Sequence, residues 1–206
     1  PEGVQDLSLP YGKVHRVRDD GSVPRDNPFI GHEMALPSIW TVGHRNPQGL
    51  EYDPSTATLW STEMGPRGGD ELNRLVRGGN YGWPLTSKGV DYDGSPVDGT
   101  TLGLELDAKT LIEPVVDFSP APSVSSMAVY RGEAFPRFDG DLLVSSLKAG
   151  ALYRIEIEGT RIVARETLIE GLGRMRDIEV DSNGFIYLLL ESRAGSKIVR
   201  MVPATL

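Results

Sequence analysis

Short runs of alternating apolar and polar residues recur along most of the chain, and a period of two is typical of β-strands with one buried face. No long segment carries an apolar residue at every third or fourth position, so no amphipathic helix is predicted. Turn signals such as Asp53-Pro54 and Asp139-Gly140 separate the runs. The pattern predicts an all-β protein, with strands at residues 14–18, 49–52, 59–62, 71–76, 115–118, 126–130, 141–145, 152–157, 161–168, 177–180, 186–190 and 198–202.

A weak internal repeat indicates how these strands are grouped. Gly49 to Glu63 resembles Asp177 to Glu191, because each stretch reads as a strand, a turn containing aspartate and a second strand that ends in glutamate. Residues 126–145 give a third copy with a longer turn. Such units, repeated at irregular intervals of about 50–75 residues without helices between them, are typical of β-propeller blades with loop insertions.

We therefore expect residues 1–206 to form one partial β-propeller domain of about three to four blades. An incomplete ring leaves a blade face and strand edges open. The missing blades are expected either upstream in a longer parent chain, which we favour, or in a second copy. The start at Pro1, without a methionine, also suggests a fragment or a processed product.

Composition narrows the classes of function. The 24 glycines and 15 prolines suit short strands joined by turns better than a helical bundle. A net charge of −8 argues against nucleic-acid binding, which normally needs a basic face. The chain has no cysteine, which excludes thiolate chemistry and disulfides. It also has no apolar run long enough to insert into a membrane and no visible signal peptide.

Two stretches carry candidate chemistry in the first half of the chain. In Gly43 to Gly49, Arg45 offers a planar fork of donors and Asn46 can donate and accept, so the stretch either clamps an anionic ligand or simply caps a strand. Glu63 to Asn73, followed by Gly78 to Pro84, combines glycine-rich turns with carboxylates. Such oxygen-rich loops suit calcium, although the spacing is not that of an EF-hand and the acids could merely be solvated.

A third group consists of Lys148, Arg174 and Arg176. Residues i and i+2 of a strand point to the same face, so the two arginines form a cationic pair that either binds an anion or is solvated. The chain has three histidines, and none sits in a spacing typical of a catalytic triad or a metal site. The chain therefore offers no convincing general base of its own.

Taken together, these stretches resemble the soluble glucose/sorbosone dehydrogenase family, specifically the aldose sugar dehydrogenases that use pyrroloquinoline quinone (PQQ). The resemblance is carried by an ordered block of three motifs and extends more loosely over most of the chain. The motifs are Gly43-His-Arg-Asn-Pro-Gln-Gly-Leu50, Gly65-Pro-Arg-Gly-Gly-Asp-Glu-Leu-Asn73 and Gly78-Gly-Asn-Tyr-Gly-Trp-Pro84.

The resemblance implies a six-bladed propeller with PQQ in a cleft on its top face. It also implies that Arg45 and Asn46 contact the quinone side, where Arg45 polarises the quinone during catalysis, and that Lys148, Arg174 and Arg176 bind the tricarboxylate. The carbonyls of Gly65 and Pro66 would bind a calcium ion that bridges PQQ and the protein. Glu71 and Tyr81 would bind a second, structural calcium ion, with Asp70 as a less certain additional ligand.

The implied reaction is oxidation of the C1 hydroxyl of an aldose sugar to a lactone, with electrons passed to an external acceptor. Such enzymes of carbohydrate metabolism are periplasmic or secreted. The family's catalytic histidine lies in an early blade, before the part that matches this chain, and His44 is not that base. We therefore expect the isolated chain to be inactive or nearly so.

Two other functions are compatible with the sequence. A non-catalytic, calcium-binding propeller would serve as a binding or structural module, but it would not need the three convergent cations at 148, 174 and 176. A lactonase-like hydrolytic propeller would need inward Asp, Asn and Glu side chains on a central calcium, which the matched loops do not offer. Substrate contacts are expected from a variable loop, Asp91 to Thr110, with Tyr92 or Trp83 lining the cleft.

Overall fold

The computed structural model describes residues 2–99, 110–159 and 161–204, and it is all-β as predicted. No helix in the described part of the chain has the length and apolar character to cross a membrane. Two 3-10 turns, η1 (Glu2–Val4) and η4 (Pro136–Phe138), accompany the strands. The strands are β1 (Lys13–His15), β2 (Ile39–Val42), β3 (Pro47–Asp53), β4 (Thr58–Glu63), β5 (Glu71–Leu75), β6 (Thr86–Val90), β7 (Pro96–Asp98), β8 (Val116–Asp117), β9 (Val124–Val129), β10 (Leu142–Ser146), β11 (Leu152–Glu158), β12 (Arg161–Ile169), β13 (Arg174–Val180), β14 (Ile186–Glu191) and β15 (Lys197–Met201).

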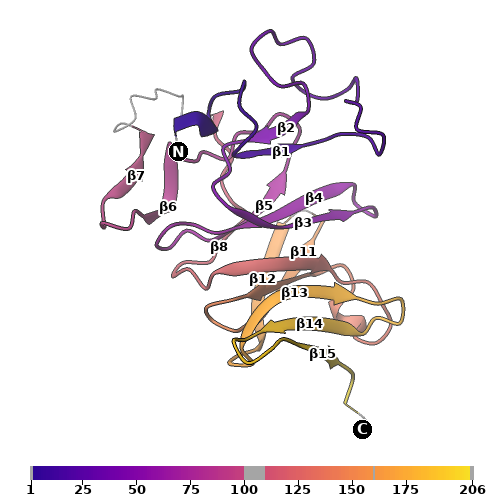
Figure 1. The fold of residues 1–206 in the computed structure, drawn as a ribbon. Helices are drawn as coiled ribbons and strands as arrows, with labels where there is room; N and C mark the ends of the chain where they lie inside the picture. The colour runs from indigo at the N-terminus through magenta and orange to yellow at the C-terminus, as the bar shows by residue number, and fades with distance from the viewer. Residues whose placement is uncertain (1, 100–109, 160, 205–206) are drawn as a thin grey trace.

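The strands form separate antiparallel sheets that follow one another in sequence order, as blades do. Two sheets have four strands, in the orders β3-β4-β5-β8 and β9-β10-β11-β12; β13-β14-β15 has three, and β1-β2 and β6-β7 have two each. Figure 1 shows these sheets stacked from the N-terminal end to the C-terminal end without closing into a ring. The arrangement is a partial β-propeller with the predicted number of blades.

The two sides of the sheet β9–β12 carry the core. All five residues of β10 are buried, which explains its near-continuous apolar run. Leu142 and Val144 pack with Trp60 and Leu72 of the preceding sheet, whereas Leu143 packs with Met175 and its neighbours in the following one. Successive side chains of β10 point to opposite faces of its sheet, so this strand packs against the preceding sheet on one side and the following sheet on the other.

The first strands of the three larger sheets, β3, β9 and β13, lie side by side. A polar seam joins these sheets and runs from Thr62 of β4 through Ser125 of β9 to Met175 of β13. The Thr62 hydroxyl donates to the Ser125 carbonyl at 2.6 Å, and the Ser125 hydroxyl donates to the Met175 carbonyl at 2.6 Å. These buried groups are satisfied across sheets, so the seam fixes the sheets relative to one another. The loops that carry the candidate site start at this end of the strands.

All twelve predicted strands are present, with ends shifted by a few residues, and three further strands were missed. β2 is almost entirely buried and shows no alternation, β6 has Val90 as its one large apolar residue, and the three-residue β7 lies within the segment predicted to be a loop. The strand predicted at residues 14–18 ends at His15, because the register with β2 shifts between Val14 and His15. Residues 100–109 of the predicted substrate loop lie outside the described residues.

The turn between β3 and β4 is held by a nearly buried carboxylate, Asp53. Burial works to raise the pKa of this carboxyl, but hydrogen bonds from Ser55, Thr56 and Arg131 outweigh it and lower the pKa to about 2. Because the folded-state pKa lies below the unfolded one, this stabilisation is present above about pH 4 and is lost as the pH falls toward 2.

We expect Asp53→Asn to lower the free energy of unfolding by about 1–2 kcal/mol at pH 7, measured by urea denaturation. The difference from the unmodified chain should shrink as the pH is lowered through this window. Asp139→Asn is the matched control, since Asp139 is 56% exposed and lies 3.5 Å from the same arginine; its cost should stay below about 0.5 kcal/mol. Equal effects of the two variants would contradict the assignment.

Candidate functional site

An open cleft of about 920 Å³ lies where the loop after β4, the β6 region and the turns near β8–β10 meet. Five of the site residues predicted from the sequence line it: Arg45, Asn46, Gly65, Pro66 and Lys148. A cleft of this size is in the usual range for a cofactor or small-molecule site. The chain therefore brings its first motif, its glycine-rich loop and Lys148 together, although they are far apart in sequence.

Arg45 is fixed from several sides. Its Nη1 donates to the carbonyls of Met64 and Gly65 at 3.0 and 3.1 Å, and its Nη2 donates to the Tyr92 hydroxyl at 3.3 Å. The guanidinium also lies over the ring of Trp83, 5.2 Å from its centroid. These contacts hold the charge at the cleft, and Tyr92 itself lines the cleft as expected.

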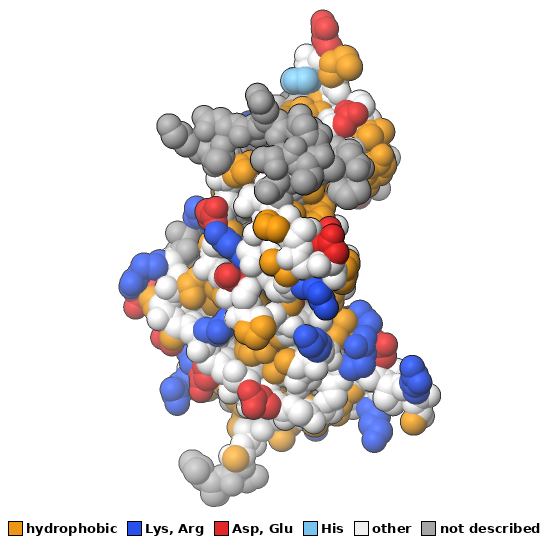
Figure 2. Space-filling model, turned by 90° about the vertical axis from the view of Figure 1, so that its left-hand side faces the viewer, with side chains coloured by type: hydrophobic (Ala, Val, Ile, Leu, Met, Phe, Trp, Pro, Cys, Tyr) orange, Lys and Arg blue, Asp and Glu red, His pale blue; other side chains and the backbone are white. Residues whose placement is uncertain are grey.

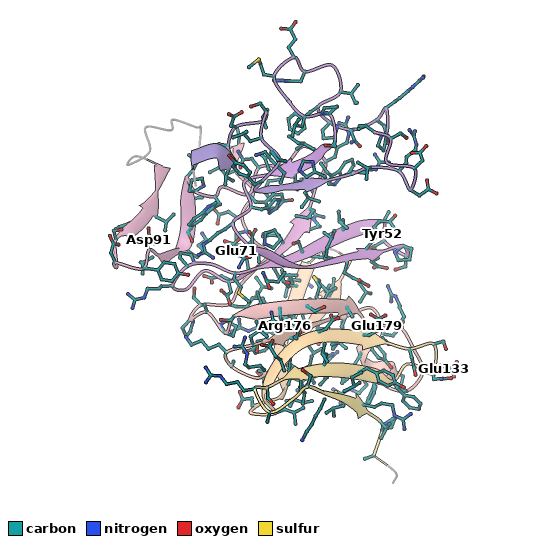
Figure 3. All side chains as sticks on the ribbon, viewed as in Figure 1. Tyr52, Glu71, Asp91, Glu133, Arg176 and Glu179 are labelled. Atoms are coloured by element: carbon teal, nitrogen blue, oxygen red, sulfur yellow. The ribbon has the colours of Figure 1, made fainter. Side chains whose placement is uncertain are left out.

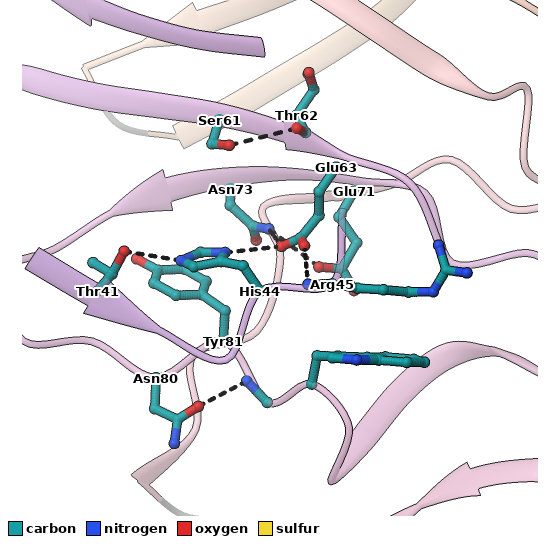
Figure 4. Close-up of polar contacts among 12 residues, drawn as sticks. Thr41, His44, Arg45, Ser61, Thr62, Glu63, Glu71, Asn73, Asn80 and Tyr81 are labelled. Carbon is teal, nitrogen blue, oxygen red and sulfur yellow. Dashed lines mark hydrogen bonds and ion pairs between the residues drawn. The ribbon is translucent and has the colours of Figure 1, made fainter. Parts of the chain in front are cut away.

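A buried polar network supports Arg45 from behind (Figure 4). Glu63 is only 4% exposed, and its Oε2 accepts the Arg45 backbone N–H at 2.9 Å. Its Oε1 accepts an N–H of the Asn73 amide at 2.9 Å and lies 3.2 Å from His44 Nδ1. His44 is fully buried, its Nε2 is 2.9 Å from the Thr41 hydroxyl, and its ring stacks on Tyr81. Both nitrogens of His44 are thus engaged, and His44 does not line the cleft.

Glu71 and Tyr81 line a smaller hollow next to the cleft, together with Glu63 and Gly65. Burial, with repulsion from the Glu63 carboxylate, raises the pKa of Glu71 to about 8. The Tyr81 hydroxyl is already used, since it donates to the Arg74 carbonyl at 2.6 Å and accepts the Val76 N–H at 2.9 Å. Tyr81 would therefore offer a cation its main-chain carbonyl rather than its side chain.

The donor set of this smaller hollow fits a hard cation. Glu63 and Glu71 both line it, and the Asn73 amide beside it donates to both carboxylates, at 2.9 and 3.1 Å, which holds them close together. The Asn73 Oδ1 has no hydrogen-bond partner among the described residues, although Asn73 itself does not line the hollow. A calcium ion takes oxygen ligands from carboxylates, amides and carbonyls alike, and it would offset the like charges. No group of three or more His, Asp or Glu side chains is arranged around a metal position in the described ranges, so carbonyl and amide oxygens would have to complete the shell.

The Gly65–Asp70 loop forms the floor of the cleft by packing backbone on backbone. A Cβ at Gly65 would lie 2.0 Å from the Gly68 carbonyl oxygen, and one at Gly89 would lie 2.4 Å from the same atom. Asp70, weighed as a less certain calcium ligand, is 1% exposed and accepts the backbone N–H groups of Gly65 and Val124 at 3.1 and 2.9 Å. Its carboxylate therefore braces the loop against β9.

Lys148 reaches the cleft from the turn between β10 and β11. Its backbone N–H donates to the Pro122 carbonyl at 3.0 Å, while its ammonium group has no hydrogen-bond or ion-pair partner among the residues that the structure describes. The same turn packs tightly on the next sheet, since a Cβ at Gly150 would lie 2.8 Å from the Gly173 carbonyl oxygen. Lys148 is thus an unpaired cation held close to the start of β13.

Arg174 and Arg176 lie at that start of β13 but do not line the cleft; Figure 3 labels Arg176. Both are exposed on either side of the buried Met175, in a part of the strand where the pairing with β14 shifts register between Met175 and Asp177. Glu191 of β14 accepts both Nε and Nη2 of Arg176 at 2.8 and 2.6 Å, and it lies 3.7 Å from Arg174 Nε. The anion that the cationic pair requires is thus supplied by the chain itself in this structure.

The cleft is positive in a chain that is otherwise acidic. Among the described residues four cations line it, Arg45, Arg67, Lys88 and Lys148, although Lys88 is paired with Glu113, which does not line the cleft. Asp70 is the one carboxylate among these lining residues, and its oxygens accept backbone N–H groups. Figure 2 shows basic side chains spread over this side of the molecule, with hydrophobic and acidic ones between them. Sequence reasoning missed Arg67 and Lys88: Arg67 lies inside the second motif, and no sequence signal marks Lys88.

The remaining histidines lie away from the cleft. His15 is exposed, and its ring nitrogens contact the Ser38 hydroxyl and the Pro10 carbonyl. His32 is exposed in the loop before β2, where its Nδ1 accepts the Met34 N–H. No histidine of this chain lines the cleft.

Known sugar dehydrogenases are similar to this chain in sequence and in fold. The family model described as Glucose / Sorbosone dehydrogenase matches residues 1–200. Aldose sugar dehydrogenase YliI of Escherichia coli K12 is 36% identical over 193 residues, which is 93% of this chain and 51% of YliI. A crystal structure of a glucose dehydrogenase matches with a TM-score of 0.89 at 37% identity, over 98% of this chain and 57% of that one.

A further solved structure is that of the PQQ-bound form of aldose sugar dehydrogenase from Streptomyces coelicolor. It matches with a TM-score of 0.72 at 25% identity and covers 96% of this chain and 53% of that one. The chain therefore spans about half the length of these relatives.

Proposed function

Because the chain belongs to the glucose/sorbosone dehydrogenase family, we propose that it supplies part of the cofactor site of a PQQ- and calcium-dependent dehydrogenase that oxidises aldose sugars at C1 to lactones. The observation that carries the proposal is the cleft itself, where Arg45, Arg67 and Lys148 form no ion pair with any described carboxylate and Asp70 is held by backbone N–H groups. Such a cleft attracts an anionic ligand, and PQQ carries three carboxylates.

In this proposal Lys148 binds a carboxylate of the cofactor, and Arg45 and Asn46 lie at its quinone edge. Arg174 and Arg176 would join Lys148 only if their guanidinium groups turn from Glu191 toward the ligand. The carbonyls of Gly65 and Pro66 would hold one calcium ion, and Glu71 with the Tyr81 carbonyl a second one. PQQ, when bound, would supply the two-electron acceptor for the sugar hydride, and calcium would act as a Lewis acid.

The residues of this chain orient ligands rather than abstract the proton. Arg45 donates hydrogen bonds from a position fixed by Glu63 and Trp83, which lowers the cost of ordering it when a ligand binds. His44 is buried and doubly engaged, and the other two histidines lie elsewhere. The base for the sugar hydroxyl is therefore expected from outside these 206 residues. We also propose a periplasmic or secreted location and an external electron acceptor.

Titration of PQQ into the chain with calcium present tests the proposal, with the cofactor's absorbance spectrum as the readout. We expect saturable binding, and Lys148→Gln should weaken it by about 10-fold, the effect of losing one charge-assisted contact. Lys197→Gln on β15 is the matched control and should leave affinity unchanged. Absence of binding by the unmodified chain would overturn the proposal.

Measured alongside, dye reduction driven by sugar and PQQ should be close to zero for the chain alone.

The second candidate, a propeller that kept its calcium sites but has no enzymatic role, would bind calcium and not PQQ. The buried Glu63–Glu71 pair favours retention of calcium in either case. The same titration distinguishes the two.

A further inference from the structure

The β6–β7 hairpin brings one aromatic side chain, Tyr92, to the wall of the cleft. Tyr92 lies in the turn between the two strands, is 67% exposed and lines the cleft. Its hydroxyl group contacts Arg45. Neither the three motifs nor the cofactor contacts proposed above give this hydroxyl group a role.

The hairpin is fixed to the floor of the cleft, so Tyr92 is not carried by a free loop. The backbone groups of Arg67 and Val90 exchange two hydrogen bonds, at 3.1 and 3.0 Å, and Arg67 Nη1 donates to the Tyr92 carbonyl at 3.0 Å. Within the turn, the Asp91 N–H donates to the Ser95 carbonyl at 2.8 Å, and the Tyr92 N–H donates to the Asp91 carboxylate at 2.6 Å. These contacts reduce the conformational entropy that a ligand bound by Tyr92 would have to remove.

The Tyr92 hydroxyl has a hydrogen left to donate. Its oxygen accepts an N–H of Arg45 Nη2 at 3.3 Å, and no other described residue is hydrogen-bonded to it. A phenol both accepts and donates, so its O–H stays available to a ligand. Because linked hydrogen bonds polarise one another, a cation on the oxygen makes this O–H a stronger donor.

Arg45 keeps donors for the same ligand atom. Its Nη1 is used by the Met64 and Gly65 carbonyls, whereas its Nε has no acceptor among the residues that the structure describes. Trp83 covers one face of the guanidinium. Since Arg45 and the Tyr92 hydroxyl are in contact and both line the cleft, they offer neighbouring donors to one oxygen atom.

We propose that the Tyr92 hydroxyl donates a hydrogen bond to the ligand oxygen that Arg45 binds, and that this oxygen is a carbonyl of the quinone cofactor. The inference rests on the proposed function, in which Arg45 lies at the quinone edge. A carbonyl oxygen suits the pair, because it has two lone pairs to accept both donors and no hydrogen of its own. Tyr92 and Arg45 together then fix the orientation of that edge.

Tyr92→Phe tests the inference, because it keeps the ring and removes only the hydroxyl group. Absorbance titration of PQQ with calcium present should show a rise in Kd of about 5-fold, as for the loss of one hydrogen bond. Tyr52→Phe is the matched control and should leave the Kd within about 2-fold. Tyr52 is 56% exposed and does not line the cleft, and Figure 3 labels it on the opposite side of the molecule from Asp91, the neighbour of Tyr92.

Two further measurements distinguish a ligand contact from an effect on the fold. Without ligand, the midpoint of urea denaturation should be the same for Tyr92→Phe and the unmodified chain, because the side chain is mostly exposed. The infrared carbonyl band of bound PQQ should lie at a higher frequency in Tyr92→Phe, since a hydrogen bond to the oxygen weakens the C=O bond.

The outcomes separate this inference from the proposed function. Failure of the unmodified chain to bind PQQ would overturn the proposed function and the role of Tyr92 with it. Binding of PQQ with equal affinity by Tyr92→Phe and the unmodified chain would overturn the role of Tyr92 alone. An unchanged carbonyl band would do the same, as would a lower urea midpoint in Tyr92→Phe, because the hydroxyl would then serve the fold.

Discussion

Replacing Glu63 by alanine is expected to lower the free energy of unfolding by about 3–5 kcal/mol, because a buried acceptor is removed from several donors at once. The Arg45 backbone N–H, the Asn73 amide and the His44 imidazole all depend on its two carboxylate oxygens. His44 and Asn73 are fully buried, so water cannot replace the carboxylate as their partner where they now lie. Urea denaturation followed by tryptophan fluorescence measures the change.

The internal repeat supplies a matched control in Glu191. Glu191 ends β14 as Glu63 ends β4, but it is 40% exposed and pairs with the exposed Arg176. Glu191→Ala should therefore cost only about 0–1 kcal/mol. A loss below about 1 kcal/mol for Glu63→Ala would show that the network around His44 contributes little to stability.

Replacing Glu71 by glutamine is expected to abolish stabilisation of the chain by calcium. At a calcium concentration about 100 times the Kd, binding should raise the free energy of unfolding by about 2.7 kcal/mol in the unmodified chain. Glutamine keeps the shape of the side chain but removes the charge that a hard cation needs. Thermal unfolding with calcium or with EDTA measures the difference.

In EDTA at pH 7 the two proteins should be equally stable within about 1 kcal/mol. Burial raises the pKa of Glu71 to about 8, so this carboxyl is largely protonated at pH 7 and is as neutral as glutamine. Glu113→Gln is the control, since Glu113 is exposed and pairs with Lys88; its response to calcium should match that of the unmodified chain. Calcium stabilisation that persists in Glu71→Gln would remove Glu71 from the site.

The strands were predictable because most of them bury one face, so alternation survives in the sequence. β2 could not be found in this way, since both of its faces are covered and its polar residue, Thr41, serves the buried His44. β6 and β7 pair with each other, and β6 also bridges to Arg67 at Val90, but neither strand alternates apolar and polar residues. Their pairing depends on the turn between them rather than on a periodic pattern.

The candidate site was predictable where the motifs are local and not where partners come from distant loops. Arg45, Asn46 and the Gly65–Pro66 turn meet at the cleft as the motifs suggest. Lys88 also lines the cleft, paired with Glu113, and no motif marks it. Conversely, Arg174 and Arg176 were predicted to bind an anionic ligand, but they lie against Glu191 of the same chain. The register of the β13–β14 hairpin brings these side chains together.

The backbone packing under the cleft has a consequence for how the protein can evolve. Gly65 and Gly89 press on the same carbonyl of Gly68 and leave no room for even one methyl group. Gly94, Gly159 and Gly171, at exposed turns, have open space around the position of a Cβ. The positive φ of these three glycines, +91°, +65° and +70°, still favours glycine there, although the space for a side chain does not. The floor of the cleft can change only if both segments move together.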